Sequence, residues 1–448
     1  MLTADQARER AHEIVDRAMR LGADAADAVF SAHASTDVSV RLGVLEDVGR
    51  SESEDLGLRV FVGRRNASVS TSDLSTASLA ELADRAIAMA REAPEDEWAG
   101  LAPADRLMHG GCPDLDLDDG AQVDPAELKA RALAAEDAAR AVPGVTNSEG
   151  GSASAGRSVV ALATSHGFAG AYAVSSHSVS ASVLAGGNGE MQRDYAYHSA
   201  HHLAGLDPAE AIGREAGERA VARVNPGRLA SGAMPVVFDP RVGSSLVGHM
   251  IGAISGSAIA RKTSFLLHAL GTRVFAPGIT VRDDPHMPRG LRSRPFDGEG
   301  LPVGPCAIVE DGMLQTWLMD SASARQLGLE PTGHAARGMG GAPGVSTSNL
   351  FIEAGNIPPE TLIGDIDNGV YVTELIGMGV NGVTGDYSRG ASGYRIVNGD
   401  IAGPVAEFTI AGNLKDMFLA MTAANDLVFR YGVNVPTLRV DGMTVASG

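Results

Sequence analysis

Cysteine is scarce in this sequence. The chain contains two, Cys112 and Cys306, among 448 residues, which is too few for a disulfide framework or for a zinc site made of four thiolates. Such sparse cysteine is typical of a protein kept in a reducing cytosol. The first residues also lack the basic segment and apolar core of a secretory signal peptide. We therefore expect a cytoplasmic protein.

Positive charge and long apolar runs are scarce as well. The chain has 36 Lys and Arg against 55 Asp and Glu, which gives a formal net charge of −19. An acidic chain is poorly suited to neutralising phosphates, so we expect no nucleic-acid partner. The longest weakly polar stretch, residues 246–260, contains His249 and is shorter than the roughly 20 residues that a membrane-spanning helix needs. We expect no membrane partner.

Aromatic residues are also few, at 4% of the chain, whereas Gly occurs 55 times. This combination suits many turns and close approaches between backbones. The chain is long enough for about two or three domains. The segment Asn225-Pro226-Gly227 is the best candidate for a boundary, which divides the chain into residues 1–225 and 226–448.

The first half reads as helices mixed with strands. Thr3 and Gln6 predict a capping box at the start of the first helix, and Ser78 and Glu81 predict another. Helices are expected from Thr3 to Gly22 and at about 78–92, 125–141 and 207–224. Strands are expected near 38–42, 58–62, 157–163 and 171–184.

The second half reads as mostly strands and turns. A strand at 235–238 leads to Asp239 and Pro240, which open a helix that we expect to reach about residue 259. The dipeptides Asp311-Gly312 and Asn398-Gly399 each predict a hairpin. Helices and hairpins segregate rather than alternate. We therefore predict an α+β fold, with an N-terminal helix-plus-antiparallel-sheet domain and a strand-rich C-terminal domain.

Several local motifs have a simpler interpretation than the site they imitate. Residues 377–382 match GxGxxG, but no helix start follows, so a Gly-rich β-turn is favoured over a dinucleotide site. The Asp-rich segment 114–119 lacks the ligands of a calcium loop and is interpreted as a solvated acidic loop. His198, His201 and His202 could bind a metal, although a partly exposed cluster without metal is favoured.

The helix after Asp239 is the most informative segment. It contains Ser244, Ser245 and His249. A zinc protease needs two His ligands and a Glu that activates water, yet the chain contains neither HExxH nor HExxxH. Its single His-Glu pair is His12-Glu13, with no second His four or five residues further on.

Several C-terminal stretches resemble the TldD/PmbA family, formerly called modulators of DNA gyrase. The most specific is TELIGMGVNGVTGDYSRG at residues 373–390, and the N-terminal layout fits too. The resemblance covers nearly the whole chain and points to the PmbA branch, also called TldE. The other matching stretches are SRPFDGEG at 293–300, SASARQLG at 321–328, IAGNLKDMF at 410–418 and PTLRV at 436–440.

The resemblance implies a cytosolic protease made of two related subunits. The TldD-type subunit carries HExxxH on a helix and a distant Cys that completes the zinc site. The PmbA-type subunit keeps the fold and pairs with it. Such complexes are thought to cut unstructured peptides, including precursors of modified peptide antibiotics and unfolded antitoxins.

The resemblance also assigns roles to positions in the helix after Asp239. Ser244 stands at the first ligand position and Ser245 at the general-base position, so His249 alone remains, and residues 424–436 offer no Cys. Catalytic zinc usually takes three protein ligands. We therefore expect no catalytic residue, metal or other cofactor in this degenerate metalloprotease helix, and zinc in the TldD-type partner. His249 is interpreted as a buried, hydrogen-bonded core residue.

The hypothesis is thus a non-catalytic PmbA/TldE-type subunit that binds extended peptides by strand pairing. Gly377, Gly379, Asp386, Tyr387 and Arg389 are candidates for lining its cleft, with a structural-turn role equally open. One alternative is a non-proteolytic protein that modulates DNA gyrase or its inhibitors. Another is a stand-alone hydrolase that uses Asp386, Tyr387 and Arg389. Whether the isolated chain forms a homodimer is left open.

Overall fold

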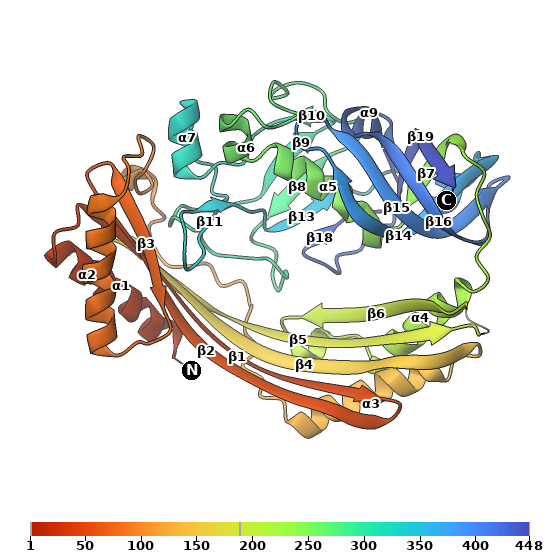
Figure 1. Ribbon diagram of the computed structural model, residues 1–448, viewed down its shortest axis with the longest axis horizontal. Helices are drawn as coiled ribbons and strands as arrows, with labels where there is room; N and C mark the ends of the chain where they lie inside the picture. The colour runs from red at the N-terminus through yellow and green to blue at the C-terminus, as the bar shows by residue number, and fades with distance from the viewer. Residues whose placement is uncertain (1, 188–189, 448) are drawn as a thin grey trace.

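A long, curved antiparallel sheet forms the first half of the protein, and a second, strand-rich unit sits over its concave face (Figure 1). The computed structural model describes residues 2–187 and 190–447. The first sheet has the strand order β3-β2-β1-β4-β5-β6. Its strands are β1 Ala25–Arg41, β2 Val44–Val62, β3 Arg65–Thr71, β4 Val145–Thr164, β5 Ala169–Ala185 and β6 Gln192–Ala200.

Four helices cover the convex face and one end of this sheet (Figure 1). They are α1 Ala4–Arg20, α2 Thr76–Glu92, α3 Pro125–Arg140 and α4 Ala209–Ala222, with short 3₁₀ turns at Ala104–Arg106 and Leu203–Gly205. Gly213 of α4 lies so close to Ala135 of α3 that an added Cβ would be 1.9 Å from the Ala135 carbonyl oxygen. Small residues therefore let these two helices pack tightly on the sheet.

The helix starts were predicted in part. The capping box of α1 is confirmed, because Thr3 accepts from the Gln6 N–H and Gln6 accepts from the Thr3 N–H. The second predicted box is wrong. Ser75, not Ser78, is the N-cap of α2, and its hydroxyl oxygen accepts from the Ser78 N–H. Ser75 has the extended backbone that an N-cap needs, so the helix begins three residues earlier.

The second half contains a nearly closed sheet and a smaller one. The larger sheet has the order β16-β15-β14-β7-β19-β17, and β16 also pairs with β19. Its strands are β7 Gly232–Phe238, β14 Asn368–Val380, β15 Asp386–Val397, β16 Asp400–Asn413, β17 Met421–Ala423 and β19 Leu438–Ser447. The smaller sheet runs β10-β9-β8-β13-β18 and comprises β8 Val281–Asp284, β9 Cys306–Glu310, β10 Met313–Leu314, β13 Asn349–Ile352 and β18 Val433–Asn434.

Five short helices and one small hairpin complete this half. They are α5 Pro240–Ala253, α6 Gly256–Ala260, α7 Ser321–Leu327, α8 Pro359–Ile363, α9 Leu414–Leu419, and the pair β11 Ala335–Ala336 and β12 Gly344–Val345. No helix in the described part of the chain is long and apolar enough to cross a membrane. The predicted α+β class is confirmed, and the domain division at residue 225 stays a prediction.

Turn chemistry predicted both hairpins correctly. Asp311 and Gly312 join β9 to β10, and Asn398 and Gly399 join β15 to β16, all four with positive φ as a type I′ turn requires. The prediction of a single helix that reaches residue 259 is wrong. It ends at Ala253, because the Ile254 carbonyl accepts from the Leu318 N–H and the Gly256 N–H donates to the Leu318 carbonyl.

Candidate functional site

Serine hydroxyls cover part of the concave face of the first sheet. Along β1, β4 and β5 the alternate residues, such as Val40, Ala153 and Val179, are buried against α3 and α4. The residues between them point to the concave side, as the period of a strand requires. Cross-strand pairing aligns one row, Ser39–Ser152–Ser180–Tyr197, across β1, β4, β5 and β6.

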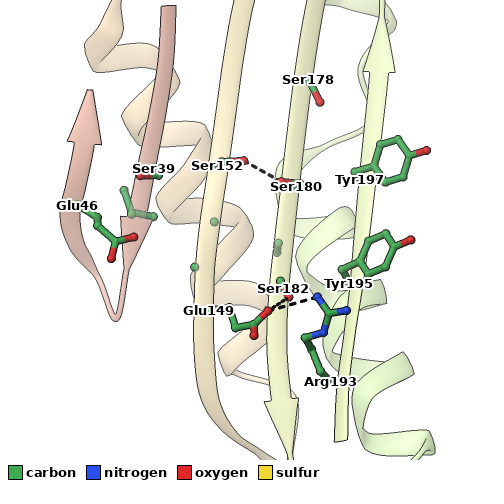
Figure 2. Close-up of a pocket in the computed structure, with 14 residues that line it drawn as sticks. Ser39, Glu46, Glu149, Ser152, Ser178, Ser180, Ser182, Arg193, Tyr195 and Tyr197 are labelled. Atoms are coloured by element: carbon green, nitrogen blue, oxygen red, sulfur yellow. Dashed lines mark hydrogen bonds and ion pairs between the residues drawn. The ribbon is translucent and has the colours of Figure 1, made fainter. Parts of the chain in front are cut away.

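This row forms the floor of a cavity of about 540 Å³. Figure 2 shows Ser152 hydrogen-bonded to Ser180, and Glu149 accepting from Ser182 beside Arg193. Short neutral hydroxyls leave the space above them open and can either donate or accept. The lining comprises Ser39, Val40, Glu46, Glu149, Gly150, Gly151, Ser152, Ser178, Ser180, Ala181, Ser182, Arg193, Tyr195 and Tyr197.

Two tyrosines of β6 form the wall of this cavity. The rings of Tyr195 and Tyr197 stack with centroids 6.3 Å apart and planes 20° apart, and both point away from the strand in the same direction (Figure 2). Tyr431, from the second half of the chain, packs against Tyr197 at 5.5 Å. Tyr195 and Tyr197 are 43% and 38% exposed. They present an aromatic surface that another planar or apolar group could cover.

Two further cavities adjoin the first at Tyr195. One, of about 320 Å³, lies where β6 meets α5, β14 and β15. The other, of about 330 Å³, reaches Ser244, Ser245 and Tyr431. Because the three cavities share wall residues, we call them together the cleft. It separates the serine-covered face of the first sheet from α5 and β14 of the second half.

Ion pairs hold the wall between the two halves. Arg241 of α5 lies 3.0 Å from Asp194 of β6, and Arg223, which directly follows α4, lies 3.3 Å from the same carboxylate. Arg223 also pairs with Glu374 of β14. Burial opposes the charge of Asp194, but Arg241 and Arg223 lower its pKa. The acid therefore stays ionised, and this network fixes β6, α4, α5 and β14 relative to one another.

The structure places the three degenerate-motif positions on one helix but not in one cavity. Ser244 and Ser245 line the cleft, and the Ser245 hydroxyl donates to the Val242 carbonyl at 2.7 Å. His249 is half-buried and packs edge-on against Tyr387 at 6.0 Å. Within the described residues its buried Nε2 has no hydrogen-bond partner, unlike the hydrogen-bonded core histidine that we predicted. Burial and Arg389 lower its pKa.

The five candidate cleft residues separate in the structure. Arg389 lines the 320-Å³ cavity. Tyr387 is 2% exposed, and burial raises the pKa of its hydroxyl to about 12. Asp386 accepts from Thr384 and Asn413 at the end of the hairpin. The three side chains therefore do not line one of the three cavities together.

Gly377 and Gly379 lie where β14 bulges away from regular pairing with β15. Gly377 has a φ of +83°, and a Cβ at Gly379 would lie 2.1 Å from the Ser388 carbonyl oxygen. Neither lines one of the three cavities. The strand then turns into β15 without a helix, so the Gly-rich segment does not form the helix start that a dinucleotide site needs.

The histidine cluster has structural contacts. His198 accepts from the Asp207 N–H, His201 lies within hydrogen-bonding distance of the Ser175 and Gly290 carbonyls, and His202 contacts the Asp116 carbonyl. His198 and His202 are partly exposed, as expected for the cluster, whereas His201 is buried at 7% exposure. Across residues 2–187 and 190–447, no group of three or more His, Cys, Asp or Glu is placed to hold a metal ion.

The Asp-rich segment forms ion pairs with neighbouring parts of the chain. Asp116 pairs with Arg289 at 2.6 Å, Asp118 with Arg157 at 2.7 Å, and Asp119 lies 3.1 Å from His177. The interpretation as an acidic loop is confirmed, since the segment has no helix or strand, but only Asp114 and Asp116 are exposed, while Asp118 and Asp119 are partly buried. The segment connects the first sheet to a loop of the second half through Arg289.

Sequence reasoning missed most of the cleft. Arg193, Tyr195 and Arg223 come from the first half and meet Arg241 and Thr373 of the second half through tertiary packing. One signal was visible in the sequence, because serine recurs at 176, 178, 180 and 182 with the period of a strand. Tyr195 and Tyr197 repeat the same spacing on the neighbouring strand.

Three family models match the chain. They describe PmbA/TldA metallopeptidase domain 1, the central domain and the C-terminal domain, which match residues 26–90, 118–224 and 231–447. Metalloprotease PmbA of Escherichia coli O157:H7 is 38% identical over 439 residues, which cover 97% of this chain and 95% of that protein. The PmbA homolog of Haemophilus influenzae is 36% identical, over 96% of this chain and 94% of its own.

Solved structures share the whole fold. A candidate modulator of DNA gyrase from Bacteroides thetaiotaomicron is 28% identical with a TM-score of 0.92, and the match covers 100% of both chains. TldE from Thermococcus kodakarensis superposes with a TM-score of 0.87 at 20% identity, over 98% of this chain and 100% of that one. At 20% identity, the similarity to TldE from Thermococcus kodakarensis shows a shared fold alone.

Proposed function

The chain belongs to the PmbA/TldD metallopeptidase family, and we propose that within it this protein binds extended peptides without cutting them. The proposal is carried by one observation. Helix α5 presents Ser244 and Ser245 to the cleft, at the positions where the family resemblance expects a zinc ligand and a general base. Neither hydroxyl supplies the imidazole or carboxylate that metal-assisted peptide hydrolysis uses.

The zinc ion that the family name implies does not fit the donors available on α5. Catalytic zinc sites usually have three protein ligands. On this helix His249 is the only imidazole, and its ring packs against Tyr387, whose buried hydroxyl also lacks a partner within the described residues. We therefore assign no step of hydrolysis to this chain, and expect the metal in a related subunit that carries HExxxH.

The shape of the cleft supports peptide binding. Strand β14 pairs with β7 only from Val370 to Val372, so on that side residues 373–380 have no neighbouring strand in the described part of the chain. Thr373, Glu374 and Leu375 line the cleft. An extended peptide could add to this edge through main-chain hydrogen bonds, which tolerate many side chains. The floor opposite presents the short neutral hydroxyls of Ser39, Ser152 and Ser180.

The same reasoning defines the partner. We propose a heteromer with a TldD-type, HExxxH-bearing homologue from the same cell, located in the cytoplasm as the sparse cysteine suggests, with unstructured peptides as substrates. The full-length, tagged chain should recover this homologue from its own lysate. The recovered complex should cut an unstructured peptide in a chelator-sensitive manner. Recovery of gyrase without such a homologue would instead favour the non-proteolytic role.

A further inference from the structure

The 320-Å³ cavity of the cleft has an unusual charge for this protein. The chain as a whole has 55 acidic against 36 basic residues. The lining of this cavity instead contains four arginines and only two carboxylates, Asp194 and Glu374. The arginines are Arg193, Arg223, Arg241 and Arg389. A cavity with excess positive charge in an acidic protein favours an anionic ligand.

Most of these arginines already have acidic partners. Arg241 pairs with Asp194 and lies 3.5 Å from Asp239, and Arg223 pairs with Asp194 and Glu374. Arg193 lies 3.6 Å from Glu149 of the adjoining cavity. The acidic partners compensate the positive charges of these three arginines. We therefore assign them to the wall of the cavity rather than to its binding group.

Arg389 is the exception. Its Nε donates to the Ile376 carbonyl at 3.3 Å, and no carboxylate lies within ion-pair distance of its guanidinium in residues 2–187 and 190–447. The side chain is half-buried and lines the cavity. Both terminal nitrogens therefore remain available for a charge-assisted, two-pronged contact with an oxyanion.

One further polar group in the same wall lacks a partner. Thr373 is 8% exposed, and its buried Oγ1 makes no hydrogen bond within the described residues. An unpartnered buried polar group is destabilising, so native proteins rarely leave one without a ligand or water to satisfy it.

We propose that this cavity is a carboxylate-binding subsite of the cleft, in which Arg389 binds the carboxylate of an extended peptide. The subsite rests on the peptide-binding function proposed above. Because Thr373, Glu374 and Leu375 line it, a peptide paired with the free edge of β14 would bring either its C-terminus or an acidic side chain to Arg389. The cavity has room for a peptide end, not for a folded chain.

The test compares three fluorescein-labelled peptides of alanine and serine, binding to the full-length chain by fluorescence anisotropy. One has a free C-terminal carboxylate, one a C-terminal amide, and one an amide with a single internal Asp. We expect the free acid to bind about tenfold more tightly than the plain amide, a difference of about 1.4 kcal/mol. The Asp peptide distinguishes a side-chain carboxylate from a C-terminal one.

Variants assign the effect to Arg389. Arg389→Gln should abolish the preference for the acid, and Arg389→Lys should keep part of it, because charge remains but the two-pronged geometry is lost. Arg395→Gln is the matched control. This exposed residue lies on the same strand, contacts Asn368 and lies outside the cleft, so its loss should leave the preference unchanged.

The outcomes separate the two proposals. Equal binding of acid, amide and Asp peptides to the unmodified chain would overturn the carboxylate subsite and leave peptide binding intact. Failure of all three to bind would overturn the peptide-binding function itself. A preference for acids that survives Arg389→Gln would place the anion site elsewhere, and would also contradict the proposal.

Discussion

The concave face of the first sheet has the same strand architecture at both ends. One end, which we call the closed end, is covered by the second half of the chain, and the other, the open end, is exposed. At the closed end the second half of the chain packs onto the sheet, where Phe296 contacts Phe168 at 5.0 Å and Tyr172 at 5.6 Å. Further along the same strand β5, Ser180 lines an open cavity. Both ends follow one strand periodicity. Along this face of β5, the end that presents an aromatic side chain is covered by the second half of the chain, and the end that presents serine is left open.

Polar groups differ between the ends as well. At the closed end Asp27, which is 2% exposed, pairs with Arg59 and with Arg337 from the second half. One nitrogen of Arg337 has no partner within the described residues, but its other nitrogens are bonded. At the open end Thr373 has no hydrogen-bond partner within the described residues, and it lines the same cavity as Arg389, which has no acidic partner there. Paired polar groups at one end indicate structure, and unpaired ones at the other indicate a ligand.

The largest expected effect is at the closed end. Asp27→Ala would leave Arg59 and Arg337 as buried charges without their shared acid, which should lower the free energy of unfolding by about 3–5 kcal/mol. Chemical denaturation of the full-length chain measures this loss. A loss below about 1 kcal/mol would mean that the two halves are not held together by this triad.

Glu299, also buried near the closed end, should make stability depend on pH. Burial and nearby Asp297 raise its pKa from 4.5 to about 7 although Ser321 donates to it. Between these two pKa values the folded state holds a proton that the unfolded state gives up. The stability that the neutral Glu299 side chain provides is therefore fully present below pH 4.5 and is lost as the pH rises to about 7. Glu299→Gln should therefore stabilise the protein at pH 8 by roughly 1–3 kcal/mol.

The control for Glu299→Gln is the same variant near pH 4.5, where both proteins carry a neutral side chain and the difference should shrink. Denaturation midpoints of both proteins across this range give the comparison. A difference that does not change with pH would show that Glu299 ionises in the folded protein as it does in the unfolded chain.

At the open end the aromatic wall should matter for binding rather than for stability. Tyr197→Ala should weaken peptide affinity about three- to tenfold, because an exposed aromatic surface contributes about 0.5–1.5 kcal/mol. Tyr197→Phe keeps the ring and should keep the affinity. Fluorescence anisotropy with an unstructured peptide measures both. Equal affinity of all three proteins would remove the tyrosine wall from the binding surface.

The smallest effect is expected in the serine floor. Ser180→Ala removes one hydroxyl from an open cavity, and the free energy of unfolding should change by less than about 0.5 kcal/mol. The same denaturation experiment as for Asp27→Ala gives the measurement. A loss comparable to that of Asp27→Ala would erase the distinction between a structural end and a binding end.

Local chemistry predicted the hairpins and most helix starts, because positive-φ dipeptides and N-cap residues act over a few residues. It missed the first half of β4, where serine and glycine hide the apolar alternation that reveals 157–163. The break after Ala253 depends on Leu318, far along the chain. Arg389 was predicted at the cleft, but its neighbours Arg223 and Tyr195 are brought there by tertiary packing, which no local pattern encodes.

The central claim is that this chain offers a peptide a cleft but no hydrolytic metal. The most direct measurement incubates the purified full-length chain with zinc and an unstructured peptide, then determines bound metal by mass spectrometry and peptide integrity by chromatography. We predict less than stoichiometric zinc and intact peptide. One tightly held zinc ion per chain, together with fragments that disappear when a chelator is added, would contradict the account.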